Sequence, residues 1–139
     1  MQGQAQAEKL VRELGIGEHV LLLPYLDQHT LWRLFARSVV YVSLSSHDGT
    51  PNTFLEALAC GSFPVVGDIA SLREWLTHGE NGLLVNPKDV RAASEAVKQV
   101  LKETQLRQKG KKANAAILSE RAAREKIRPA VQEFFDRLM

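Results

Sequence analysis

Residues 45–67, SSHDGTPNTFLEALACGSFPVVG, constrain the fold more than any other stretch of the chain. Their pattern predicts a loop that turns into a short helix and then into a buried strand. Pro51 fixes its own φ and favours extended backbone just before it, and Asn52 is a good N-cap. We therefore expect the helix to begin at about Thr53, and Gly61 is well placed to end it.

The expected helix carries one charged side chain, Glu56, among apolar neighbours. A helix that is apolar on nearly every side is normally buried, and a carboxylate there is paired, hydrogen-bonded or turned into a cleft that binds a ligand. Asp48 lies eight positions earlier, in the loop that leads to the helix. The free N–H groups and the positive dipole end of the helix therefore lie between two carboxylates. That arrangement suits a phosphate whose neighbouring hydroxyls are held by the acids.

The rest of the chain alternates short apolar segments with helical ones. Strands are predicted at 19–23, 39–43, 63–67 and 82–85, and helices at 4–14, 30–37, 53–60 and 72–78. Ser71 is expected to cap the last of these helices, with Glu74 as its capping-box partner. From Asp89 onward the pattern is helical, with segments at 90–103, 105–118 and 120–138. The prediction is an α/β fold: a Rossmann-like parallel sheet of about four strands flanked by helices, with a helical C-terminal tail.

Composition excludes several classes of protein. The 139 residues suit one soluble domain, with 45% hydrophobic and 24% charged residues and a net charge of +2. The single cysteine, Cys60, excludes an internal disulfide and fits a reducing compartment. No apolar run approaches the roughly 20 residues of a membrane span, and the first residues lack the apolar centre of a signal peptide. We therefore expect a cytoplasmic protein.

Basic residues are numerous in the tail, between positions 98 and 128, where glutamates are interleaved with them. A basic strip can face nucleic acid or an anionic membrane. Aromatic partners are lacking before Phe134, so a solvated helical face is the favoured interpretation and no nucleic-acid partner is expected. Peripheral membrane contact stays open.

Two runs carry a family resemblance, DGTPNTFLEALACGSFPVVGD and SLREWLTHGENGLLVNPKD. They resemble the C-terminal, donor-binding domain of retaining glycosyltransferases of the two-domain GT-B type, glycosyltransferase family 4. That family shows an acid, Gly, any residue and Pro, then an apolar helix with Glu eight places after the first acid, then A-C-G and a Pro-Val-Val strand. An N-G-L-L-V strand is its second signature. The resemblance covers about residues 3–101.

The resemblance implies a role for each matching position. Asp48 and Glu56 form the catalytic pair, of which Asp48 contacts the donor sugar and Glu56 the ribose hydroxyls. The implied donor-binding residues are Tyr25, Leu26, Gly49, Thr50, Pro51, Asn52, Thr53, Phe54 and Leu55. The implied substrate is a UDP-, GDP- or ADP-sugar. No cofactor and no metal are expected, because the helix terminus and basic side chains offset the phosphate charge.

The chain also departs from the family pattern. Asp48 is one methylene shorter than the usual Glu, Ala70 and Ser71 stand where a Gly pair is usual, and Pro24 replaces a common Gly. Two strands, a basic segment that grips the diphosphate and the acceptor domain are missing. We therefore expect a fragment without transferase activity of its own: residues 1–103 form part of the nucleotide-sugar-binding domain, and 104–139 are its helical extension. A carbohydrate or lipid-linked acceptor would meet the missing N-terminal domain.

Alternatives stay open at this stage. The chain could be a non-catalytic nucleotide-sugar-binding or interaction domain of the same fold, or a free-standing α/β module whose basic tail binds a partner or a polyanion. Asp48 beside Gly49 could be simple turn chemistry. Trp32 and Trp75 are expected to pack rather than stack on a ligand, and Cys60 is expected to be a small buried side chain.

Overall fold

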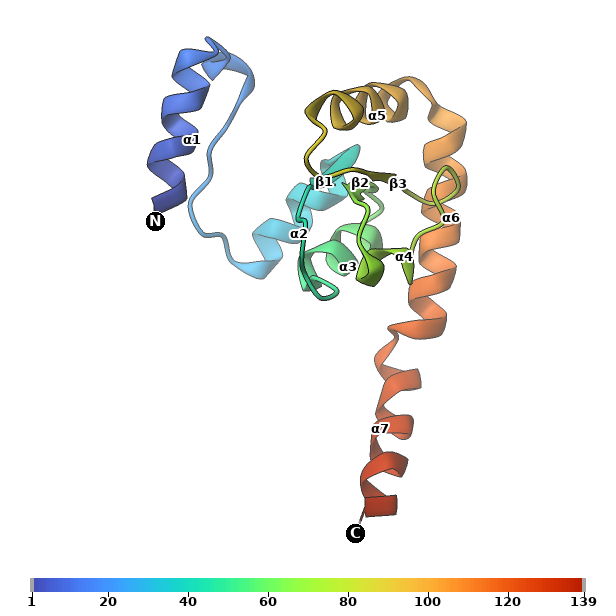
Figure 1. The fold of residues 1–139 in the computed structure, drawn as a ribbon. Helices are drawn as coiled ribbons and strands as arrows, with labels where there is room; N and C mark the ends of the chain where they lie inside the picture. The colour runs from blue at the N-terminus through green and yellow to red at the C-terminus, as the bar shows by residue number, and fades with distance from the viewer. Residues whose placement is uncertain (1, 139) are drawn as a thin grey trace. The chain divides into compact units, whose positions relative to one another are not determined.

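The computed structural model describes residues 2–138 and has an α/β architecture (Figure 1). Its elements are α1 (Gln2–Glu13), a 3₁₀ turn η1 (Gly17–His19), α2 (Gln28–Arg37), β1 (Val40–Ser43), α3 (Asn52–Ala59), β2 (Phe63–Gly67), α4 (Ala70–Arg73), β3 (Leu83–Val85), α5 (Val90–Lys102), α6 (Thr104–Arg121) and α7 (Arg124–Leu138). The chain divides into two compact units, Met1–Thr30 and Leu31–Met139.

The sheet lies in the second unit and is parallel, in the order β1-β2-β3. Val65 pairs with Val42 on one side and with Leu83 on the other. Every residue of β2 is buried, as expected of a central strand in a parallel sheet whose two faces are both covered. The predicted α/β fold with a parallel sheet and a helical tail is confirmed.

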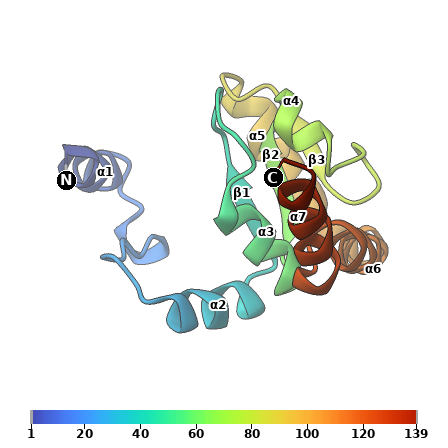
Figure 2. The same ribbon diagram turned by 90° about the horizontal axis from the view of Figure 1, so that it is seen from below.

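Helices cover both faces of this sheet, with α5 on one face and α3 on the other (Figures 1 and 2). Successive residues of β2 alternate between the faces. Phe63 and Val65 pack with Val100 of α5, whereas Val66 packs with Phe54 of α3. The two apolar clusters on either side of β2 hold the carboxyl ends of the strands in place.

The predicted strand at residues 19–23 is not formed, so the sheet has three strands among residues 2–138 rather than about four. His19 ends η1, and Val20 has extended backbone. Leu21 is 79% exposed. An apolar extended segment becomes a strand only when a neighbouring strand supplies hydrogen-bond partners, and no described strand pairs with this one.

Two predicted helix N-caps are also wrong. Helix α3 begins one residue early, so that Pro51 rather than Asn52 stands at its N-cap. Helix α4 is a single turn with Ile69 at its N-cap, because the Ile69 backbone is extended and its carbonyl already accepts from Arg73 at 3.1 Å. Ser71 therefore lies inside the turn and does not cap it.

Helix α6 is fastened to the sheet by features that the sequence interpretation missed. The side-chain amide of Asn81 donates to Asn114 Oδ1 at 2.8 Å, and Asn114 Nδ2 donates to the Asn81 carbonyl at 2.9 Å. Both residues are buried, at 2% and 1% exposure. A Cβ on Gly110, one turn earlier, would lie 2.5 Å from the Phe63 ring. In the sequence, the only hint of this packing was an Asn at position 114 and a Gly at position 110 within a charged helix.

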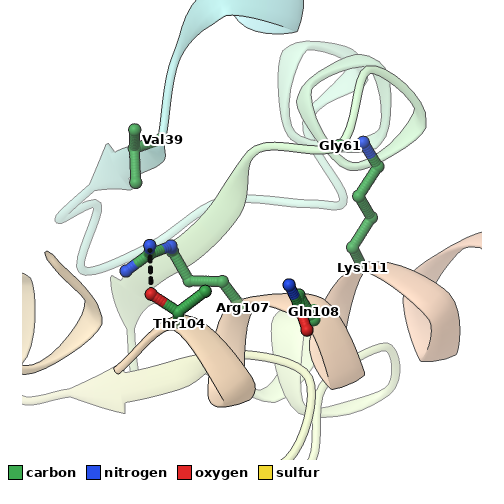
Figure 3. Close-up of a pocket in the computed structure, with 6 residues that line it drawn as sticks. All are labelled: Val39, Gly61, Thr104, Arg107, Gln108 and Lys111. Atoms are coloured by element: carbon green, nitrogen blue, oxygen red, sulfur yellow. Dashed lines mark hydrogen bonds between the residues drawn. The ribbon is translucent and has the colours of Figure 1, made fainter. Parts of the chain in front are cut away.

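A further contact lies at the amino edge of the sheet, beside a cavity of about 200 Å³ lined by α6 side chains (Figure 3). Arg107 donates to the Leu101 carbonyl at 2.9 Å and to Thr104 Oγ1 at 2.9 Å. The Lys111 side chain covers Gly61, whose φ of +89° ends α3 as predicted. A cation at this position complements the negative dipole end of α3.

Candidate functional site

The loop between β1 and α3 leaves the carboxyl edge of the sheet, where ligands bind in doubly wound folds. Two side chains from the segment after β2 hold it. Trp75 Nε1 donates to Thr50 Oγ1 at 3.2 Å, and Ser71 Oγ donates to the Asp48 carbonyl at 3.0 Å. Asp48 is therefore presented from a loop that is anchored at two points, although its own side chain is exposed.

Gly67 lets this loop pass close to the end of β2. A Cβ at Gly67 would lie 2.4 Å from the Ser45 carbonyl oxygen and 3.3 Å from Pro87 Cβ. Real side-chain carbons do not approach a backbone oxygen that closely, so glycine is required for the observed loop path. The sequence interpretation placed Gly67 at the end of a strand, at the start of a candidate site segment, but did not foresee this close approach. Its position at the carboxyl end of a central strand was the signal.

The N-terminus of α3 points out from this loop. Phe54 N and Leu55 N bond to the Pro51 carbonyl, at 3.1 and 3.3 Å. No side chain within the described part of the chain caps α3. The N–H groups of Asn52 and Thr53 precede these bonded amides and lie at exposed residues. An uncapped helix N-terminus of this kind offers donors and a positive partial charge to an anion.

The other predicted site residues differ in exposure. Phe54 is 1% exposed and belongs to the core, so only its backbone is near the helix terminus. The exposed members are Asp48, Gly49, Asn52 and Thr53, and the half-buried ones are Thr50, Pro51, Leu55 and Glu56. Tyr25, 91% exposed, and Leu26 belong to the unit Met1–Thr30. The second unit therefore brings together the loop and the α3 residues.

Glu56 lies on the outward face of α3, where two hollows meet. One, of about 400 Å³, is lined by Leu55, Glu56, Ala59 and residues near the end of α6. The other, of about 300 Å³, is lined by Trp32, Glu56, Ala59 and Cys60. The helix was expected to be buried on nearly every side, but Ala59 is exposed and leaves this face open. Glu56 thus lines both hollows.

Cys60 follows α3 and faces the smaller hollow. Burial, and then the negative charge of Glu56, raise the pKa of its thiol above the ordinary value. The thiol therefore stays protonated at neutral pH, which does not suit a nucleophile or a metal ligand.

An ion pair stiffens the turn after β2. Arg73 Nε and Nη2 donate to the two carboxylate oxygens of Asp68, at 2.6 and 2.9 Å. The hydrogen bonds from Arg73 hold the pKa of the Asp68 carboxyl below its usual value. This turn carries Ser71, so the pair supports the residue that anchors the Asp48 carbonyl.

Across residues 2–138, His, Cys, Asp and Glu side chains do not gather in groups of three or more that could hold a metal ion. In the same range, none of the helices combines the length and apolar character needed to cross a bilayer.

Comparison with known proteins identifies the family. Residues 2–116 match the model for "Glycosyl transferases group 1". A GDP-mannose:cellobiosyl-diphosphopolyprenol alpha-mannosyltransferase from Xanthomonas campestris is 29% identical over 68% of this chain and 25% of its own length. An exopolysaccharide phosphotransferase from Streptomyces coelicolor is 35% identical over 97% of this chain and 14% of its own length. The chain thus spans a quarter or less of these relatives.

A solved structure gives the same fold. Sucrose-phosphate synthase from Thermosynechococcus elongatus superposes with a TM-score of 0.91 at 23% identity, covering 99% of this chain and 34% of that one. The match confirms the predicted fold of a GT-B C-terminal domain with its helical tail. Together with the family model, it shows that this chain belongs to the group 1 glycosyl transferases.

Proposed function

We propose that this chain is the donor-binding part of a retaining glycosyltransferase, which transfers a sugar from a nucleotide-sugar to an acceptor. The observation that carries the proposal is the uncapped N-terminus of α3 beside an anchored acidic loop. A diphosphate is the ligand that such a terminus suits best. Asp48 and Glu56 supply carboxylates in the loop before it and on the helix itself.

The proposed roles follow from position. The amides of Asn52 and Thr53, with the first turn through Leu55, receive the diphosphate. Glu56 holds the ribose hydroxyls, and Asp48 orients the donor sugar. The loop residues Gly49, Thr50 and Pro51 place backbone beside that sugar.

The chemistry needs a stabilised leaving group. When the bond between the anomeric carbon and the donor phosphate breaks, the electron pair and negative charge go to the diphosphate. A helix N-terminus stabilises that charge without reorganisation. The departing phosphate oxygen can then take the proton from the acceptor hydroxyl that attacks. No protein-bound metal or cofactor enters this scheme, and the donor is a UDP-, GDP- or ADP-sugar.

The acceptor is a carbohydrate or a lipid-linked sugar, bound by a domain beyond this chain. A relative whose name specifies a diphosphopolyprenol acceptor supports the lipid-linked alternative. We place the reaction in the cytoplasm, with peripheral contact to the membrane that carries such an acceptor. The isolated chain is expected to bind donor without transferring sugar.

Thermal unfolding with nucleotides tests the proposal. We expect UDP, GDP or ADP, and the matching sugar conjugates, to stabilise the chain selectively. A ligand at one hundred times its dissociation constant adds about 2.7 kcal/mol to the free energy of unfolding. Glu56→Ala should lose most of the effect, whereas Glu120→Ala, a change at an exposed glutamate of α6, should keep it. No stabilisation by any nucleotide, or equal stabilisation of the Glu56→Ala protein, contradicts the proposed site.

A further inference from the structure

Trp75 lies between the sugar-facing loop and the end of α6. Its Nε1 donates to Thr50 Oγ1 at 3.2 Å. On its ring, the guanidinium carbon of Arg121 lies 4.5 Å from the centroid. Arg121 is the last residue of α6, and its Nη1 also donates to the Glu74 carbonyl. One arginine of the tail thus contacts both the main chain before Trp75 and the indole itself.

We propose that Arg121 and Trp75 are positioning residues, through which the tail holds the loop that carries Asp48. The expected effect on donor binding rests on the proposed donor function. The link from Arg121 through Trp75 to the loop rests on the contacts alone. It assigns a role to the end of α6, which lies beyond residues 3–101 that carry the sequence resemblance.

The physical reason lies in the geometry of the indole. Its N–H points along the ring edge, so the ring must keep one orientation for Nε1 to reach Thr50. A guanidinium stacked on the ring face favours that orientation, because a cation is attracted to the electron-rich face. The bond from Arg121 to the Glu74 carbonyl fixes the guanidinium in turn. Arginine can make both contacts at once because its planar group stacks while its edges donate.

The loop receives this restraint at two neighbouring points. Ser71 holds the Asp48 carbonyl and Trp75 holds Thr50, and both belong to the segment from α4 onward. This segment is fixed from the other side by the buried Asn81, whose amide donates to the Trp75 carbonyl at 3.0 Å. The position of residues 48–50 therefore depends on how the end of α6 packs against Trp75.

The contrast between donor and bare nucleotide gives a specific expectation. Residues 48–50 face the donor sugar, whereas the α3 terminus faces the diphosphate. Loss of the Arg121 contact should therefore weaken binding of the nucleotide-sugar about threefold. Binding of the free nucleoside diphosphate should stay almost unchanged. A merely structural role for Arg121 would weaken both alike.

The link is tested by NMR hydrogen exchange on the ¹⁵N-labelled chain. The indole N–H of Trp75 is assigned by its loss in Trp75→Phe. We expect Arg121→Leu to raise its exchange rate about fivefold, since the hydrogen bond to Thr50 opens more often. Arg121→Lys, which keeps the cation, should restore part of the protection. Arg124→Leu, in the first turn of α7, is the matched control and should change nothing.

Binding to UDP and UDP-glucose, GDP and GDP-mannose, and ADP and ADP-glucose is then compared between the original chain and Arg121→Leu. Faster indole exchange with selective weakening of a sugar conjugate supports the proposal. Unchanged exchange in Arg121→Leu, or equal weakening of conjugate and diphosphate, overturns it. If exchange rises while the original chain binds no nucleotide, the link from tail to loop stands and the donor function fails.

Discussion

Asn114→Leu should lower the free energy of unfolding by about 3 kcal/mol, because leucine fills the space but cannot hydrogen-bond. The substitution leaves the Asn81 carbonyl without its donor and removes one acceptor from the Asn81 amide. Both groups are buried. Water therefore cannot replace the lost partner unless the contact between α6 and the loop before β3 opens. Urea unfolding followed by circular dichroism measures the change.

Gln108→Leu is the matched control for this substitution. It makes the same change from amide to leucine on the same helix, but at an exposed position. Its free energy of unfolding should stay within about 0.5 kcal/mol of the original. Equal stability of the Asn114→Leu and Gln108→Leu proteins would show that the amide pair does not hold α6 to the sheet.

Gly67→Ala is expected to lower the free energy of unfolding by a similar amount and also to disturb the candidate site. The new methyl would lie 2.4 Å from the Ser45 carbonyl oxygen, so the loop backbone must move away. Such overpacking typically costs about 1–3 kcal/mol of stability. Because Ser45 begins the loop that carries Asp48, we also expect the Thr50 amide to shift in NMR spectra and nucleotide-sugar binding to fall.

Gly49→Ala is the matched control, because it makes the same glycine-to-alanine change in the loop without a clash. A Cβ at Gly49 meets nothing within 4 Å, so that variant should lose no stability. If Gly67→Ala is as stable as Gly49→Ala and keeps its loop resonances in place, the close approach of loop and strand is not a constraint.

Local pattern was sufficient for the centre of the fold. A short apolar run bounded by Gly61 and Gly67 predicted β2, and the structure confirms a fully buried central strand. The N-G-L-L-V run likewise became β3, and the helical pattern after Asp89 became α5 to α7. These elements could be predicted because burial on both faces leaves a continuous apolar signal.

The errors arose where the outcome depends on a distant partner. Residues 19–23 have strand composition, yet no described strand pairs with them. Ser71 is of a residue type that often caps helices, yet it lies inside the turn and its hydroxyl donates to the Asp48 carbonyl. The fit of Asn114 against Asn81 requires knowledge of which helix crosses which loop. Sequence spacing within one segment carries no such information.

The candidate site divides in the same way. The spacing of Asp48 and Glu56 around a helix start predicts an anion site at the helix terminus, and that site stays a prediction. The anchors of the loop, Thr50 to Trp75 and Trp75 to Arg121, join segments far apart in the chain. They became visible only once α4 and α6 were placed around the loop.

Locating a bound nucleotide on the chain is the most direct test of the donor site. ¹⁵N spectra of the protein titrated with UDP, GDP and ADP would report which amides sense the ligand. We expect at least one of these diphosphates to shift amides within residues 48–56, most strongly at Asn52 and Thr53. Shifts confined to another surface, such as the cavity beside Lys111 and Gln108 at the amino edge, would contradict it. So would the absence of shifts with all of them.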